Sequence, residues 1–242
     1  NRFGGPLFVV ALTLYLCGLA HTSIFPSASA INSSTAARLE TAQLVLAAVG
    51  LIFLVATNLA DPGTVTPASV PTRELELVLG GEDGKDHAPR QRGLVRHAGT
   101  GDTLVPYKWC DTCEVWRPPR ASHCSVCNRC YERFDHHCPW VGTCVARNNH
   151  KFFVSFLVSI SGAGICLAGG LLLCTDALRH GLGVGDALRP GAAFALLLVS
   201  ASCFCALGCG ALGSCAMLLT DPTIKEDNDQ SKGRRRPPRL PG

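Results

Sequence analysis

Charged residues are scarce in this chain. Only 17% of its 242 residues are Asp, Glu, Lys or Arg, and 47% are hydrophobic, whereas charged residues make up about a quarter of a soluble domain. This scarcity argues against a soluble globular protein and favours one that resides in a membrane. The chain begins at Asn1 rather than at a methionine, so we expect a fragment or a chain trimmed at its start.

Charge is absent, except at the ends, from four long apolar stretches at residues 7–25, 43–60, 152–175 and 192–220. Each is long enough to cross a bilayer, which takes about 20 residues. The second is the shortest and could extend back toward Ala36. The run "LVLAAVGLIFLVA" has no polar face at helical spacing, which excludes a surface helix of a soluble protein. Because three spans follow the first one, we interpret it as a retained helix rather than a signal peptide. Few polar groups lie inside the spans, which disfavours a transporter.

Lysine and arginine are unevenly distributed between the segments that join these spans. Twelve lie between Asp61 and Lys151 and six follow Thr220, but only Arg38 lies between the first two spans. Positive residues concentrate in cytosolic segments, so the long connection and the tail are predicted to be cytosolic. We expect an endomembrane (ER or Golgi) or plasma-membrane location, with both termini on the cytosolic side.

These patterns predict an all-α membrane protein of four transmembrane helices. Between helices 2 and 3 we expect a small cytosolic domain of short β-hairpins, stapled by zinc, on the basis of the cysteine cluster and the family resemblance described below. Residues 62–106 are rich in Gly, Pro, Thr and charge and have no periodicity, which is typical of a flexible spacer. The predicted segments are transmembrane helices 1 and 2 (1–60), a flexible cytosolic spacer (61–106), a cysteine-rich zinc domain (107–151), transmembrane helices 3 and 4 (152–220) and a basic cytosolic tail (221–242).

Half of the fourteen cysteines lie between Cys110 and Cys144, and the other seven are scattered through apolar segments. The scattered ones are interpreted as small packing residues. The clustered ones are mixed with histidines at close spacing, which indicates metal binding in a reducing compartment rather than disulfides. The segment from Cys110 to Cys144 is too short to bury a hydrophobic core of its own. Zinc bound by Cys and His ligands would stabilise its fold.

This cluster offers seven cysteines and three histidines, of which two closed tetrahedral sites would use eight donors. If each site is Cys3His, one cysteine and one histidine remain, although spacing alone does not say which. Asp135, His136 and Cys138 are the attractive choice, because a thiol beside an imidazole and a carboxylate is the composition of an activated nucleophile. His137 and Cys138 cannot easily serve one ion, since neighbouring side chains point apart. A zinc-stapled scaffold without enzymatic activity remains open on spacing alone.

The stretch "CDTCEVWRPPRASHCSVCNRCYERFDHHCPWVGTCVARNNHKFF" strongly resembles the cysteine-rich domain of DHHC-type protein S-acyltransferases, also called protein palmitoyltransferases. It looks most like the plant enzymes and the related Ras-acylating subgroup. The tripeptide Asp61-Pro62-Gly63 after the second span and the four-span layout also match the family.

The resemblance implies a protein S-acyltransferase that moves a long-chain acyl group, palmitoyl, from acyl-CoA to cysteines of target proteins. Cys138 would be the nucleophile that becomes the acyl-enzyme, His136 its general base and Asp135 the residue that orients His136. Trp140 would contact the first carbons of the acyl chain. The implied partners are acyl-CoA, membrane-associated proteins with cytosolic cysteines and the bilayer, and no nucleic acid is expected. Two structural zinc ions are implied, one held by Cys110, Cys113, His123 and Cys130 and the other by Cys124, Cys127, His137 and Cys144.

Some positions depart from the family pattern. Gly142-Thr143 stand where the family often has Asn-Asn, and Ile224 replaces the second Thr of a motif after the fourth span. Small residues at 161–164 leave room for a chain of sixteen carbons or more, but they equally suit close helix packing.

Overall fold

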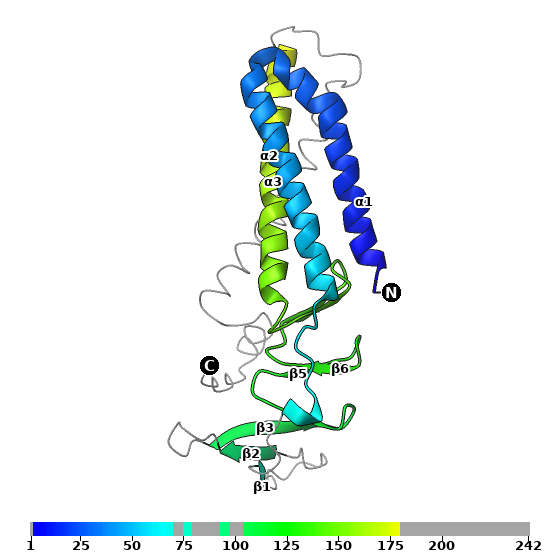
Figure 1. Ribbon diagram of the computed structural model, residues 1–242, viewed down its shortest axis with the longest axis vertical. Coiled ribbons are helices and arrows are strands. Elements are labelled where there is room, and N and C mark those ends of the chain that lie inside the picture. Colours follow the sequence, from blue (N-terminus) through cyan, green and yellow to red (C-terminus); the bar gives the residue numbers. More distant parts are fainter. Residues whose placement is uncertain (1, 70–74, 79–91, 97–103, 180–242) are drawn as a thin grey trace. The chain divides into compact units, whose positions relative to one another are not determined.

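A computed structural model describes residues 2–69, 75–78, 92–96 and 104–179 of the chain (Figure 1). The chain divides into two compact units, which are described separately. The helical unit contains residues 1–59, 139–142 and 151–220, and the strand unit contains residues 60–138, 143–150 and 221–242.

The helical unit is built from α1 (Gly4–Leu19), a π-helical turn (Ala20–Ile24), α2 (Phe25–Leu59) and α3 (His150–Arg179), which begins in the strand unit. Three helical stretches are long and apolar enough to cross a membrane, namely Gly4–Ser29, Ile31–Leu59 and His150–Asp176. They contain the first three predicted spans. The predicted fourth span, residues 192–220, lies outside the described residues.

The second span is longer than the sequence predicted. α2 contains a break at Asn32, whose backbone is not helical (φ −150°, ψ 94°). The backbone N–H of Thr35 donates to Asn32 Oδ1 at 3.0 Å, so Asn32 caps the helix that follows. This cap explains why the helix begins before Gln43, where the uncharged run starts.

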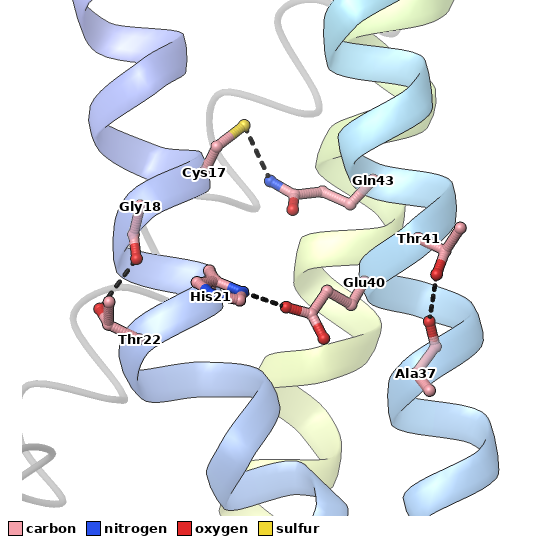
Figure 2. A network of polar contacts seen from close by, with 8 residues as sticks. All are labelled: Cys17, Gly18, His21, Thr22, Ala37, Glu40, Thr41 and Gln43. Atoms are coloured by element: carbon pink, nitrogen blue, oxygen red, sulfur yellow. Dashed lines mark hydrogen bonds and ion pairs between the residues drawn. The ribbon is translucent and has the colours of Figure 1, made fainter.

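The additional turns bring polar groups between α1 and α2 (Figure 2). His21 Nδ1 lies 2.6 Å from Glu40 Oε1, and the Gln43 amide donates to Cys17 Sγ at 3.4 Å. The helix of the second span thus extends back past Ala36, the direction of extension that the sequence left open, and includes Glu40, whose carboxylate lies beside His21 of the π-helical turn.

Close packing of α2 on α3 depends on small residues. A Cβ added at Gly162 would lie 3.0 Å from Leu46, and one at Gly50 would lie 2.7 Å from Ile160. Figure 1 shows the two helices side by side. Of the two interpretations of the small residues at 161–164, the structure therefore supports close packing at Gly162.

Within the residues that the structure describes, the strand unit holds eight short strands, all paired antiparallel. Two of them, β1 (Leu75–Val78) and β2 (Arg92–Arg96), lie in the stretch for which the sequence predicted an irregular spacer. Each holds only two or three apolar residues, mixed with Glu or with Gly and Arg, inside sequence rich in Gly, Pro, Thr and charge, so neither shows a clear strand pattern. The remaining strands are β3 (Leu104–Cys110), β4 (Val115–Arg117), β5 (Ser122–Cys124), β6 (Arg129–Tyr131), β7 (His136–Cys138) and β8 (Thr143–Val145).

Three hairpins in this part of the chain share one loop geometry. β3–β4, β5–β6 and β7–β8 are each joined by four residues, at 111–114, 125–128 and 139–142. The last loop residue has a positive φ in every case: 52° at Glu114, 52° at Asn128 and 70° at Gly142. Gly and Asn adopt this backbone most readily, which explains how Gly142 can stand where the family often has Asn.

The Asp61-Pro62-Gly63 tripeptide joins the strand unit through its backbone. The N–H groups of Gly63 and Thr64 donate to Asp61 Oδ2, which folds the segment into a turn. The Gly63 carbonyl then accepts from the N–H of Glu132 at 2.8 Å, and the Pro62 carbonyl accepts from the N–H of Asn148 at 3.1 Å. These bonds attach the Asp61-Pro62-Gly63 segment to the residues on either side of the β7–β8 hairpin.

Candidate active site and metal clusters

Asp135, His136, His137 and Cys138 form the DHHC stretch, whose last three residues are β7, and the strand geometry separates their side chains. Successive side chains of a strand point to opposite faces, so His136 and Cys138 share one face while His137 lies on the other. The cross-strand partner of His137 is Cys144. His136 therefore lies beside the thiol of Cys138, whereas His137 lies opposite Cys144 of β8.

Two quartets of donors converge in the strand unit, and each has the Cys3His composition of a closed zinc site. Within each quartet, the ligand atoms all lie within 4.8 Å of one another. In the first, His123 Nδ1 lies 3.7, 3.2 and 3.8 Å from the three sulfurs. In a tetrahedral zinc site, the sulfur–nitrogen separation is about 3.6 Å, so both quartets fit zinc. Their members are Cys110, Cys113, His123 and Cys130, and Cys124, Cys127, His137 and Cys144.

The register of the hairpins produces this grouping. Each quartet combines one Cys-x2-Cys loop with one cross-strand pair, His123 opposite Cys130 or His137 opposite Cys144. His123 and Cys124 are neighbours on β5 and point to opposite faces, which sends them to different quartets.

The thiols of a quartet have different acidities. Burial raises the pKa of Cys110 and Cys124, but backbone N–H groups of their own loops donate to the sulfurs and lower it overall. Burial and the neighbouring thiols raise the pKa of Cys130 and Cys144. Three thiolates at such short distances repel one another, and a bound divalent metal ion would neutralise their charge. All cysteines in the described residues are free thiols, in agreement with the prediction of metal binding rather than disulfides.

Cys138 belongs to neither quartet. Cys138 immediately precedes the loop of the β7–β8 hairpin, just as Cys110 precedes the β3–β4 loop and Cys124 precedes the β5–β6 loop. The position that holds the second cysteine in those loops, Cys113 or Cys127, is Val141 in the third. The third hairpin therefore lacks the second thiol of a metal-binding loop.

Asp135, His136 and Cys138 form a hydrogen-bonded series. The Asp135 side chain is 2% exposed, and its Oδ2 lies 3.2 Å from His136 Nδ1. Burial lowers the pKa of His136, but hydrogen bonds with Asp135 and Cys138 outweigh it and raise that pKa to about 9. At neutral pH the imidazole is therefore protonated, and the opposite charges of Asp135 and a Cys138 thiolate stabilise it.

A second histidine, His150, faces the same carboxylate. Its Nε2 lies 3.7 Å from Asp135 Oδ2, and the two side chains are 7% and 2% exposed. His150 was not predicted as a site residue, because fifteen positions separate it from Asp135 and only the fold brings the two side chains together.

A family model described as DHHC palmitoyltransferase matches residues 104–230, which is more than half of the chain. The chain belongs to the DHHC palmitoyltransferase family.

Several curated palmitoyltransferases are similar to this family member. Palmitoyltransferase ZDHHC18 of Homo sapiens is 40% identical over 175 residues, which cover 66% of this chain and 44% of that protein. Probable protein S-acyltransferase 6 of Arabidopsis thaliana is 46% identical over 110 residues, covering 45% of this chain and 26% of its own length. Palmitoyltransferase ZDHHC9 of Bos taurus is 39% identical over 137 residues, which cover 52% of this chain and 36% of that protein. The chain thus spans less than half the length of each of these relatives.

In the helical unit of this DHHC palmitoyltransferase family member, the loop that follows Cys138 packs on the ends of α1 and α2. The buried Asn58 amide donates to the Val141 carbonyl at 2.8 Å. A Cβ at Gly5 would lie 1.7 Å from the Pro139 carbonyl oxygen. The Trp140 ring is 57% exposed and lies 6.0 Å from the ring of Phe8, so two aromatic rings of the helical unit lie together.

Proposed function

We propose that this chain is a protein S-acyltransferase that transfers a long-chain acyl group, typically palmitoyl, from acyl-CoA to cysteines of membrane-associated proteins. One observation carries the proposal. Cys138 is hydrogen-bonded to an imidazole that a buried carboxylate orients, and this thiol lies outside both zinc-compatible quartets. A zinc scaffold would have no use for such an arrangement.

In the first half-reaction, the Cys138 thiolate, whose proton His136 already holds, attacks the thioester carbonyl of acyl-CoA. The new carbon–sulfur bond to Cys138 forms as the bond to the coenzyme A sulfur breaks, and His136 gives its proton to the departing coenzyme A thiolate. In the second, a target cysteine gives its proton to His136, and its thiolate attacks the acyl-Cys138 thioester and releases the Cys138 thiolate. One thioester replaces another in both steps, so the catalyst needs thiol activation and proximity rather than a strong driving force.

Asp135 holds the Nδ1 side of His136, which leaves the other ring nitrogen for the thiol. The two zinc ions would be structural, held by the two quartets, and would fix the hairpins in place. Trp140, with Phe8 beside it, is proposed to contact the first carbons of the acyl chain.

We further propose that the spans lie in an endomembrane (ER or Golgi) or plasma membrane, with the strand unit on the cytosolic side. This orientation is supported by the excess of Lys and Arg between Asp61 and Lys151. It would allow the acyl chain to lie in the bilayer while coenzyme A stays in water.

The test is mass spectrometry of the purified chain incubated with palmitoyl-CoA, with Cys138→Ser and the matched control Cys17→Ser. Cys17 is a free cysteine of α1 outside both quartets. We expect the wild type and Cys17→Ser to gain one hydroxylamine-sensitive palmitoyl group, whereas Cys138→Ser gains none and keeps its zinc. A wild-type chain that binds zinc but never turns over palmitoyl-CoA would support the scaffold function instead.

A further inference from the structure

The carboxylate of Asp135 is approached by two imidazoles rather than one. His136 Nδ1 lies 3.2 Å from Asp135 Oδ2 and His150 Nε2 lies 3.7 Å from the same oxygen. His136 comes from β7, and His150 is the first residue of α3. Both rings therefore converge on a single buried oxygen atom from different elements.

The position of the His150 ring is fixed by the chain around it. The His150 N–H donates to the Ala146 carbonyl at 3.0 Å. The buried Asn149 side chain accepts from the Ala146 N–H at 2.9 Å and donates to the Cys144 carbonyl at 2.8 Å. On the same strand, the Val145 carbonyl accepts from the N–H of Asp135 at 3.0 Å. Residues 144–150 thus hold His150 and Asp135 in one hydrogen-bonded block.

A role as core filler does not explain this histidine. Its side chain is 7% exposed, and its Nδ1 has no hydrogen-bond partner among the residues that the structure describes. Burying a ring nitrogen without a partner is unfavourable, and an apolar side chain would fill the space without that cost. The tautomer with its proton on Nε2 would direct an N–H toward Asp135, which is a reason to retain the imidazole.

We propose that His150 is a positioning residue for Asp135, and through it for the His136–Cys138 pair. The inference rests on the proposed function for its catalytic meaning, although its geometry does not. His150, at the start of α3, restrains the carboxylate so that Oδ2 stays directed at His136 Nδ1. Without His150, the carboxylate can rotate away and His136 loses the partner that orients it toward the thiol.

The test uses the full chain and substitutions that differ in one donor. In His150→Gln, the amide nitrogen reaches the place of Nε2, whereas in His150→Asn it stops at the place of Nδ1. His150→Phe keeps the ring volume and removes both nitrogens. The first readout needs no acyl-CoA: it is the rate at which iodoacetamide alkylates Cys138, with Cys17 of the same molecule as the reference thiol. The second readout is the rate of acyl-enzyme formation from palmitoyl-CoA, resolved into kcat and KM.

We expect His150→Phe and His150→Asn to slow both Cys138 alkylation and kcat by about tenfold, since supporting residues of a site typically act at this scale. KM for palmitoyl-CoA and zinc content should stay unchanged, and His150→Gln should recover most of the rate. In an Asp135→Asn background, His150→Phe should cost nothing further, because residues that act through one group are not additive.

Three results would overturn the inference: wild-type Cys138 reactivity in His150→Asn, equal rates in the Gln and Asn variants, or an undiminished effect of His150→Phe in the Asp135→Asn background. If His150→Phe loses its zinc, the comparison between the Gln and Asn variants still decides. If Cys138 alkylation follows the expected pattern while the wild type never accepts palmitoyl from palmitoyl-CoA, the proposed function fails and the positioning role stands.

Discussion

Replacing each of the two adjacent histidines, His136 and His137, with glutamine should have different effects: one on acyl-enzyme formation and the other on zinc binding. His136 contacts Asp135 and Cys138, whereas His137 Nδ1 lies 3.4 Å from Cys127 Sγ and 3.6 Å from Cys144 Sγ. His136→Gln should therefore leave both quartets intact and slow acyl-enzyme formation. A positioned acid–base group contributes roughly 10²–10⁴ in rate, which corresponds to about 3–5 kcal/mol of activation free energy.

His137→Gln should instead remove the nitrogen ligand of the second quartet and leave three crowded thiols. Structural zinc in small modules binds with about 10–16 kcal/mol of apparent free energy, which is comparable to the whole stability of a domain, about 5–15 kcal/mol. Even a partial loss of that affinity should release one zinc ion per chain and lower the melting temperature. His137 pairs with Cys144 across β7 and β8, so this hairpin should loosen first.

Both variants can be compared in one preparation, with zinc per chain measured by elemental analysis and acyl-enzyme by mass spectrometry. The expected pattern is two zinc ions without acyl-enzyme for His136→Gln, and one zinc ion with a lowered melting temperature for His137→Gln. Zinc loss in His136→Gln, or full zinc and full acylation in His137→Gln, would refute the division of roles along β7.

Three further substitutions probe the loop after Cys138. Asn58→Ala removes the donor to the buried Val141 carbonyl and should destabilise the chain by about 1–3 kcal/mol, seen as a lower melting temperature in detergent; Thr57→Ser, next to it, is the control. Gly142→Ala places a Cβ on a residue with φ of 70°, 1.8 Å from the Arg2 carbonyl oxygen, and should lower the melting temperature further; an unchanged value would contradict this packing. Trp140→Ala should raise KM for palmitoyl-CoA more than for a short-chain acyl-CoA, and an equal change for both would argue against contact with the acyl chain.

The sequence predicted the composition of the metal clusters but not their membership. Counting donors left one cysteine and one histidine over, and only the resemblance assigned them. The structure shows the physical reason, because a one-residue shift on a strand changes the face of every side chain. His123 and His137 each lie opposite a cysteine of the next strand, and such cross-strand pairs depend on a register that spacing alone does not reveal.

Other features escaped the sequence because they depend on contacts between distant segments. Glu40 precedes the uncharged run, yet the helix already includes it, and His21 of the preceding π-helical turn lies 2.6 Å away. His150 acquires its partner only when residues 144–150 fold back beside Asp135. Apolar length alone was sufficient for the first three spans, since a bilayer requires the same length of any sequence.

The third hairpin shows how the proposed catalytic thiol can arise beside two zinc-compatible clusters. Its loop has the same length as the loops of the first two hairpins and the same positive φ at its last residue. In the first two, backbone N–H groups of the loop donate to the leading cysteine and lower its pKa. Cys138 is the leading cysteine of the third loop, but Val141 stands where a second thiol would be needed to bind metal. Its loop has no second thiol, so Cys138 lies outside both quartets while His137, on the same strand, belongs to the second, which fits the proposed division of roles. Removing zinc should therefore also abolish acylation, whereas removing the Cys138 thiol should leave zinc in place.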